Sequence, residues 1–184
     1  MRKLIYLFNV TLDGCSQHDK QFVDPELLGY YTQSLASADM FVYGRKTYQL
    51  MVPYWPGVLK DSSASEAETA FARAFVSKKK VVFSRTLESA EEADTCIVRG
   101  DLPDEILKLK RQPGNDILVG GVDLPSQLVE LGLIDEFRFV IGPVIAGRGQ
   151  RLFDDVSLPE KLRLKLLETK VLSSGCVLLH YAKQ

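Results

Sequence analysis

Short apolar runs alternate with helix-like segments along this chain of 184 residues. We predict strands at 4–10, 40–43, 80–84, 95–98, 117–119 and 136–141, and helices at 25–36, 45–51, 67–77, 101–110 and 123–131. A helix between two strands returns the chain to the same edge of a sheet, so the two strands lie parallel. The alternation therefore predicts an α/β fold with a mostly parallel central sheet and flanking helices.

The carboxyl-terminal part of the chain departs from this alternation. Residues 162–171 and 176–182 have strand-like patterns, and the Ser173-Ser174-Gly175 segment between them predicts an antiparallel hairpin. Residues 52–65 contain prolines, a glycine and several serines, so we expect a loop there. No repeat or linker-like segment divides the sequence, and one domain spanning 1–184 is expected.

Composition excludes several classes of function. A net charge of −1 argues against a broad basic surface for nucleic acid or for anionic membranes. We interpret Lys78-Lys79-Lys80 as a solvated helix end. No apolar run approaches the roughly 20 residues of a membrane helix. The apolar part of residues 1–8 is too short for a signal peptide, so it is expected to be the first strand of a cytoplasmic protein.

The cysteines and histidines do not form a metal-ligand pattern. Cys15, Cys96 and Cys176 are far apart and have no C-x-x-C spacing, and neither His18 nor His180 lies at a ligand spacing from them. This usage predicts free thiols in a reducing cytoplasm, with no disulfide and no metal site.

Three predicted strands end in residues suited to a phosphorylated ligand. These ends are Gly44-Arg45-Lys46-Thr47, Ser84-Arg85-Thr86 and Gly120-Gly121-Val122. Open parallel sheets bind ligands at the carboxyl ends of their strands. Glycine lets the backbone approach a pyrophosphate, while cations and hydroxyls hold phosphate oxygens. Each segment alone is also consistent with an ordinary surface turn, but the three together favour a nucleotide site.

The cations at these ends indicate which nucleotide. Arg45 with Lys46 and, separately, Arg85 form two cationic clusters, which suit a nucleotide with a 2′-phosphate on its adenosine ribose. We therefore expect NADPH as cofactor in preference to NADH. The G-x-G-x-x-G fingerprint is absent, which argues against a Rossmann dehydrogenase.

On these segments the sequence resembles the dihydrofolate reductase fold. It resembles more closely the reductase domain of the bifunctional riboflavin-biosynthesis deaminase/reductase family. The family signature is matched, in chain order, by Gly120-Gly121, Leu124 to Leu131, Asp135-Glu136, Pro143, Gly147-Arg148-Gly149 and Leu152-Phe153. The first strand also ends in a matching Thr11-Leu12-Asp13-Gly14. The resemblance implies a dihydrofolate reductase-like fold over nearly the whole chain.

The resemblance further implies an NADPH-dependent reductase. Its family reduces a ribosylaminopyrimidine phosphate by hydride transfer to the ribose carbon of a ring-opened imine, and juxtaposition of donor and acceptor is most of the catalysis. The 2′-phosphate of NADPH is expected near Arg45 and Arg85, and the pyrophosphate near Thr47 and Gly121.

The first strand and the terminal hairpin receive roles from the same resemblance. The nicotinamide is expected beside Asn9, Val10 and Asp13, and Asn9 is a candidate for binding the small-molecule substrate. A homodimer is also implied, with Leu178 and its apolar neighbours in the hairpin as a candidate dimer face.

The chain departs from the family pattern in two places. It has no deaminase half, because H-x-E with P-C-x-x-C is missing. Residues 15–22 stand where the family has a glycine- and serine-rich loop with an aromatic residue. The substrate of this chain is therefore open.

Several candidate residues have two interpretations. Asp13 is our catalytic candidate as a proton relay or ribose-binding group, and a plain turn is the alternative. Trp55 is expected to line the substrate cleft or to pin its loop, and Arg148 to bind a substrate phosphate or to lie solvated. Asp24 or Glu26 could protonate a pterin, but Asp24 is also a good helix N-cap.

Three functions follow from these residues. The first is an NADPH-dependent reductase of the riboflavin-pathway type. The second is a dihydrofolate reductase-like pterin reductase, which requires a carboxylate that faces the nicotinamide from the 25–36 helix. The third is a domain that binds NADP(H) without catalysis.

Overall fold

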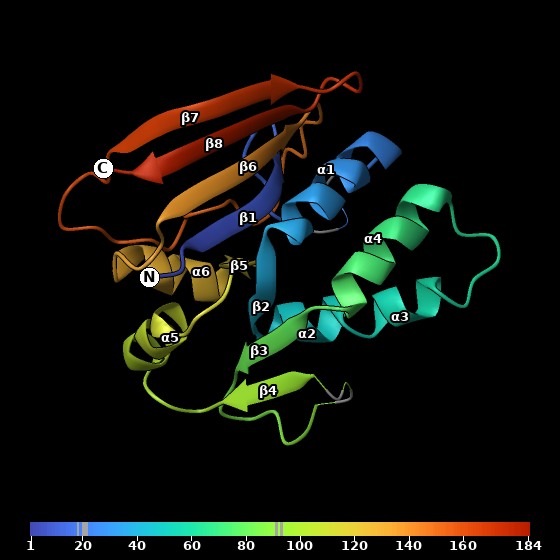
Figure 1. The fold of residues 1–184 in the computed structure, drawn as a ribbon. Coiled ribbons are helices and arrows are strands. Elements are labelled where there is room, and N and C mark those ends of the chain that lie inside the picture. Colours follow the sequence, from blue (N-terminus) through green and yellow to red (C-terminus); the bar gives the residue numbers. More distant parts are fainter. Residues whose placement is uncertain (18, 20–21, 91, 93) are drawn as a thin grey trace.

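The computed structural model describes residues 1–17, 19, 22–90, 92 and 94–184. They form a sheet with the strand order β4-β3-β2-β5-β1-β6-β8-β7 (Figure 1). The strands are β1 Leu4–Thr11, β2 Ala38–Gly44, β3 Lys79–Phe83, β4 Thr95–Val98, β5 Asp116–Val119, β6 Glu136–Gly142, β7 Leu164–Val171 and β8 Val177–Lys183. In this order, the six neighbouring strands β4, β3, β2, β5, β1 and β6 pair in parallel. Strand β8 pairs antiparallel with both β6 and β7.

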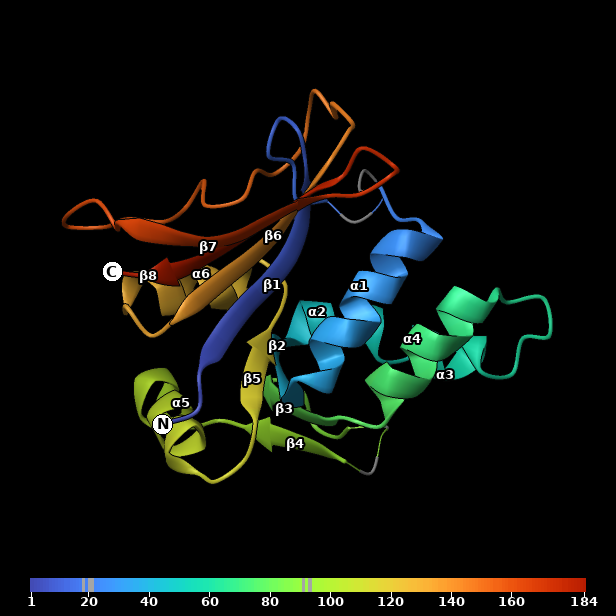
Figure 2. The same cartoon turned by 45° about the horizontal axis from the view of Figure 1, so that its top comes forward.

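Helices cover both faces of this sheet. They are α1 Pro25–Ala36, α2 Arg45–Met51, α3 Tyr54–Val58, α4 Glu66–Val76, α5 Leu102–Arg111 and α6 Asp123–Glu130. Figure 2 shows α1 and α4 side by side on one face, and α5 and α6 lie on the other face in Figure 1. The predicted α/β architecture and its terminal antiparallel hairpin are confirmed.

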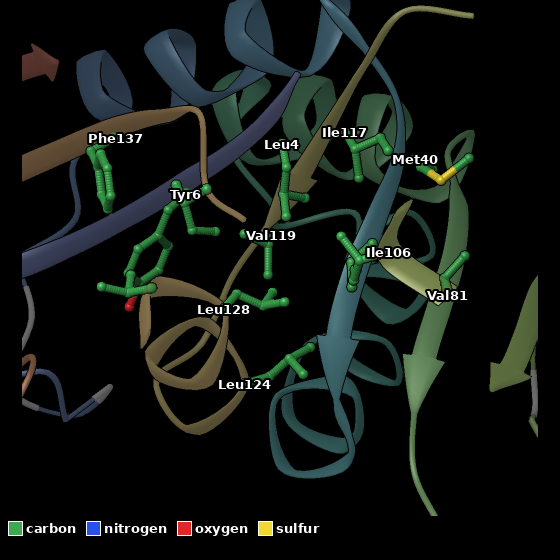
Figure 3. Packing of buried hydrophobic residues seen from close by; sticks show 13 residues of the cluster. Leu4, Tyr6, Met40, Val81, Ile106, Ile117, Val119, Leu124, Leu128 and Phe137 are labelled. Atoms are coloured by element: carbon green, nitrogen blue, oxygen red, sulfur yellow. The ribbon is translucent and has the colours of Figure 1, made fainter. Parts of the chain in front are cut away.

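The two larger apolar clusters of the core lie one on each face of the sheet, and a third, smaller cluster packs Leu27 of α1 against β6 and β8. Successive side chains of β1 belong to different clusters. Leu4 and Tyr6 lie in the cluster with α5 and α6, and Ile5 lies in the cluster with α1 and α4. Figure 3 shows the first cluster, in which Ile106 of α5 and Leu128 of α6 pack against the strands. Because side chains of a strand point alternately to opposite faces, one short strand serves both clusters.

Local signals in the sequence set the helix boundaries. Asp24 Oδ1 accepts a hydrogen bond from the Leu27 N–H at 2.7 Å and caps α1, as its position before Pro25 predicts. A capping box of Ser65 and Glu68 begins α4. Among the described residues, no helix has the length and apolar character needed to span a membrane.

The segment predicted as a loop at 52–65 contains the short helix α3. Pro56 lies in the first turn of that helix, where a backbone N–H has no partner within the helix, so it does not interrupt the hydrogen bonding. The ring of Trp55 packs on that of Phe71 in α4 with centroids 4.4 Å apart. Tertiary packing therefore stabilises a helix that proline and glycine content argued against.

Two predictions about single side chains are wrong. Lys80 is fully buried. Its ammonium is compensated there, because it donates to the carbonyl oxygen of Val76 and pairs with Glu92, both at 3.0 Å. Leu178 is also buried, against Leu27 and Val140, and so is not exposed for a dimer face.

Candidate active site

A cleft of about 1060 Å³ lies at the carboxyl ends of the central strands. One part of it, the polar half, is formed by the residues that follow β2, β3, β4 and β5, namely 44–47, 84–86, 99–103 and 120–123. The other part, the apolar half, consists of Leu7, Asn9, Val23, Leu28, Tyr31, Leu35, Leu50, Met51, Trp55, Phe71 and Phe75. The cleft thus lies where an open parallel sheet is expected to bind a ligand.

Side-chain contacts join the three strand ends that were predicted to act together. Arg45 Nη1 donates to Thr86 Oγ1 at 2.6 Å, which links the start of α2 to the segment after β3. Lys46 Nζ lies 2.7 Å from Asp123 Oδ2 and links α2 to the start of α6. Segments far apart in the sequence therefore form one continuous wall.

Glycine is required at the turn between β5 and α6. Gly121 has a φ of +93°, and a Cβ atom there would lie 2.2 Å from Thr47 Oγ1. The ring of Tyr43 packs so closely on Gly120 that an added Cβ would be 3.1 Å from it. The Tyr6 hydroxyl donates to the Gly121 carbonyl oxygen at 2.7 Å, and burial raises the pKa of Tyr6, so this donor stays protonated. The turn is closely packed, and its residues form part of the cleft wall.

The polar half contains one cation that the sequence argument missed. Arg99 follows β4, is exposed, and donates from Nη2 to the Leu87 carbonyl oxygen at 2.6 Å. The signal was available, because Arg99-Gly100 follows a predicted strand just as the cationic segment at Gly44 does. With Arg45, Lys46 and Arg85, it gives four cations against the two carboxylates Asp101 and Asp123 among the described residues of the cleft wall. The polar half therefore suits an anion.

Aromatic rings form much of the apolar half. Trp55 stacks edge-on against Phe71, and Tyr31 lies 6.3 Å from the same ring. Tyr31 Oη and Trp55 Nε1 are buried and have no hydrogen-bond partner among the residues that the structure describes. Asn9 lines this half, and its amide makes no hydrogen bond to the described part of the chain.

Asp13, the catalytic candidate, does not line the cleft. Its carboxylate accepts hydrogen bonds from Thr11 Oγ1 at 2.6 Å and from the N–H groups of Ala146 at 3.0 Å and Gly147 at 2.9 Å. Arg151 adds a contact of 3.5 Å. These donors, Thr11 Oγ1 first, lower the pKa of Asp13 to about 2. The ionised side chain ties the end of β1 to the loop that carries Gly147 and Gly149.

The other two predicted residues outside the cleft wall have different surroundings. Arg148 is exposed in the loop held by Asp13, and it does not line the cleft. Val10 is buried in β1, next to Asn9 in the cleft wall. Ser16 and Gln150, which lie next to the Arg148 loop, do line the cleft. Ser16 Oγ donates a hydrogen bond to the Gln150 carbonyl oxygen at 2.9 Å.

Neither candidate carboxylate of the first helix lines the cleft. Asp24 caps α1, and Glu26 Oε2 accepts hydrogen bonds from the N–H and hydroxyl of Ser173, at 2.9 and 2.5 Å. The helix presents Leu28 and Tyr31 to the cleft instead. No cluster of three potential metal ligands occurs in the part of the chain that the structure describes, and His18 lies outside it.

Comparisons with known proteins agree with this architecture. The family model of the RibD C-terminal domain matches residues 2–178. Protein YyaP of Bacillus subtilis (strain 168) is 35% identical over 186 residues, which cover 98% of this chain and 94% of that protein.

Two solved structures share the fold. Acinetobacter baumannii RibD matches with a TM-score of 0.67 and 17% identity over all of this chain and 58% of its own. Dihydrofolate reductase from Enterococcus faecalis, complexed with NADP(H) and RAB-propyl, matches with a TM-score of 0.65 and 12% identity over 99% of this chain and 96% of its own.

Proposed function

This chain belongs to the RibD C-terminal domain family, and from that premise we propose that it is an NADPH-dependent reductase with a single domain spanning 1–184. The observation that carries the proposal is the polar half of the cleft. Four cations and a closely packed glycine turn meet there at adjacent strand ends, as a nucleotide with several phosphates requires.

The residues present fit the cofactor. Arg45 and Arg85 would hold the 2′-phosphate, and Thr47 and the backbone of Gly121 would hold the pyrophosphate. The other members of this set are Gly44, Lys46, Ser84, Thr86, Gly120 and Val122, which all line the same wall. A dihydrofolate reductase of similar fold in complex with NADP(H) supports the assignment.

The first strand would position the reacting groups. Bound NADPH would supply the hydride. Asn9, with Val10 behind it, would orient the nicotinamide at the boundary between the two halves, and Trp55 would face the acceptor. Asp13 would act as a positioning residue, because it fixes the loop that carries Arg148, Gln150 and the edge of the cleft.

The family indicates which bond of the substrate would accept the hydride. We propose reduction of an imine or a related polarised double bond, with the ribosylaminopyrimidine phosphate of the riboflavin pathway as the compound that the resemblance implies. An imine that is already protonated in water needs no acid from the protein. Placing donor and acceptor together is then the main contribution of the chain.

The pterin alternative has less support. It requires a carboxylate that faces the cleft from α1, and Asp24 and Glu26 are both engaged elsewhere. A non-catalytic NADP(H)-binding domain stays an alternative, which turnover alone can separate from a reductase.

Titration calorimetry tests the cofactor assignment. NADPH is expected to bind at least about tenfold more tightly than NADH, since a phosphate–arginine pair contributes more than 1.4 kcal/mol. Arg45→Ala with Arg85→Ala should remove this preference and leave NADH affinity nearly unchanged. Lys60→Ala, an exposed cation that does not line the cleft, is the matched control.

Turnover is then measured as the loss of reduced-nicotinamide absorbance with the ribosylaminopyrimidine phosphate and with dihydrofolate as acceptors. Absence of NADPH binding would refute the proposed function. Binding without turnover of either compound would favour the non-catalytic alternative or a different acceptor.

A cytoplasmic homodimer completes the proposal. The three cysteines are unpaired, as is usual in a reducing compartment. Since Leu178 is buried, the exposed residues of β7 are the better candidates for the dimer face.

A further inference from the structure

A buried tyrosine joins the core of the sheet to the glycine turn of the cleft. Tyr6 lies in β1 with 0% of its surface exposed, and its ring extends toward α6 (Figure 3). Its hydroxyl donates to the Gly121 carbonyl oxygen at 2.7 Å. Burial raises the pKa of Tyr6, so the hydroxyl keeps its proton and stays a donor. A residue of the cleft wall is therefore bound from the core side.

Aromatic rings hold Tyr6 in place. The ring centroids of Phe8, Phe139 and Phe153 lie 6.0, 5.2 and 6.1 Å from that of Tyr6. Phe153 has a φ of +69°, which is an unfavourable backbone conformation for a residue with a side chain. Such a conformation persists only where the surrounding structure imposes it. The segment after β6 thus contributes a ring whose position is fixed, and this ring supports Tyr6.

The carbonyl that Tyr6 binds belongs to a turn with adjacent glycines. Gly120 precedes Gly121, and Gly121 has a φ of +93°. Glycine permits many backbone conformations, so the residue types alone leave open the orientation of the peptide group between Gly121 and Val122. Val122 is the N-cap of α6 and makes no capping hydrogen bond with its side chain. The hydrogen bond from Tyr6 fixes the orientation of this peptide group.

This orientation decides which partial charge the turn presents to the cleft. The carbonyl oxygen and the N–H of a trans peptide group point in opposite directions, and the turn has no cis peptide bond. Because the Gly121 oxygen is directed to Tyr6 in the core, the Val122 N–H points away from the core, and both residues of the peptide line the cleft. The reversed peptide group would direct a carbonyl oxygen, which repels phosphate, away from the core.

We propose that Tyr6 is a positioning residue for the pyrophosphate of the cofactor. Its hydroxyl holds the Gly121 carbonyl oxygen in the core, so that the turn offers N–H groups to the phosphate oxygens. Tyr6 does not line the cleft, and it acts only through Gly121. The inference rests on the proposed NADPH-dependent reductase and adds a residue from the core to its cofactor site.

Removal of the hydroxyl tests this role. Tyr6→Phe keeps the ring, and its affinities for NADPH and NADH, measured by titration calorimetry, are expected to fall by the same factor of about three to ten. The preference for NADPH over NADH should stay unchanged, because the variant leaves Arg45 and Arg85 intact. Adenosine 2′-monophosphate has the 2′-phosphate without a pyrophosphate, and it should bind equally to both proteins.

A control variant separates positioning from a loss of stability. Ile106→Val removes a buried methylene from the same apolar cluster, at a residue of α5 that does not line the cleft. Urea unfolding should show a lower midpoint for Ile106→Val and for Tyr6→Phe. Below the unfolding range, Ile106→Val should keep its affinity for both dinucleotides. If Tyr6 served stability alone, Tyr6→Phe would keep these affinities as well.

A second variant tests the support of Tyr6 by its neighbouring ring. Phe153→Leu removes the ring but stays apolar, and it should weaken NADPH and NADH binding about twofold, with no effect on adenosine 2′-monophosphate. In combination with Tyr6→Phe it should cause no further loss, since both residues act through one contact. If Tyr6→Phe does not fold, Phe153→Leu tests the inference by itself, and unchanged dinucleotide affinity in it would overturn the role of Tyr6.

The outcomes separate this inference from the proposed function. Unchanged dinucleotide affinity in Tyr6→Phe, or an equal loss of affinity for adenosine 2′-monophosphate, would overturn the role of Tyr6 and leave the reductase in place. If the unmodified protein binds neither NADPH nor NADH, the reductase and the role of Tyr6 are both refuted. A loss confined to the two dinucleotides, at a constant preference for NADPH, would support both.

Discussion

The carboxylate of Asp13 joins two parts of the chain that are far apart in sequence. It accepts from Thr11 Oγ1 in β1 and from the N–H groups of Ala146 and Gly147 in the distant loop. Gly147 has a φ of +75°, which favours glycine, and its N–H is one of the donors. The Asp-Gly and Gly-x-Gly segments of the family signature therefore contact each other, and this contact gives them a structural role.

A dependence of stability on pH follows from this residue. The pKa of Asp13 is about 2 in the folded protein and 3.8 as its ordinary value, so the folded state favours the ionised form. The resulting stability is present above about pH 3.8 and is lost as the pH falls toward 2. Asp13→Asn should therefore be less stable than the unmodified protein near neutral pH, and the difference should shrink below about pH 4.

Urea unfolding of both proteins between neutral pH and about pH 3 measures this difference. Asp155→Asn removes an exposed carboxylate that makes no hydrogen bond to the described residues, and it should leave the unfolding curve unchanged. A difference between Asp13→Asn and the unmodified protein that stayed constant down to the lowest pH would contradict the role given to Asp13.

At the scale of elements, Lys80 fastens β3 to α4. Its ammonium donates to the carbonyl oxygen of Val76, the last residue of α4, and lies 4.9 Å from the centre of the Phe75 ring. A cation at the carboxyl end of a helix is favourable because the last carbonyl groups lack partners there. Glu92, from the segment before β4, completes the set at 3.0 Å.

Removing the acid partner should destabilise this junction. Glu92→Gln leaves a buried ammonium without its counter-charge, although the Val76 carbonyl still accepts a hydrogen bond from it. We expect a loss of about 2 kcal/mol in the free energy of unfolding. Denaturant unfolding measures it, with Glu88→Gln at an exposed glutamate as the control. Equal stabilities for the two variants would show that the pair does not stabilise the protein.

Lys80 also shows what kind of information the sequence lacked. The strands, most helices and the hairpin were predictable, because apolar periodicity and capping residues such as Asp24 are local signals. Three of the strand ends in the cleft were predictable for the same reason. The burial of Lys80 depends on Glu92 and α4, and helix α3 depends on the packing of Trp55 against Phe71. Such contacts exist only after the chain has folded.

At the scale of the whole molecule, the cleft and the edge strand β7 lie in different parts of the sheet. The cofactor segments follow β2 to β5, whereas β7 forms the opposite edge, beyond β6 and β8 (Figure 1). Leu166, Leu167 and Val171 of β7 are between 47% and 70% exposed. An exposed edge strand with apolar side chains favours association with another chain. A homodimer through β7 would leave both clefts open.

This arrangement predicts that association and cofactor binding are independent. Sedimentation should give about twice the 20.6 kDa mass of one chain, and Leu166→Lys with Val171→Lys should reduce it to one chain. The control is Ile145→Lys, at a 71% exposed residue in the loop after β6, and this variant should stay dimeric. NADPH affinity should be the same in all three proteins, because β7 contributes no residue to the cleft wall. A monomeric unmodified protein would refute the dimer. Loss of NADPH affinity on dissociation would show instead that a second chain contributes to the site.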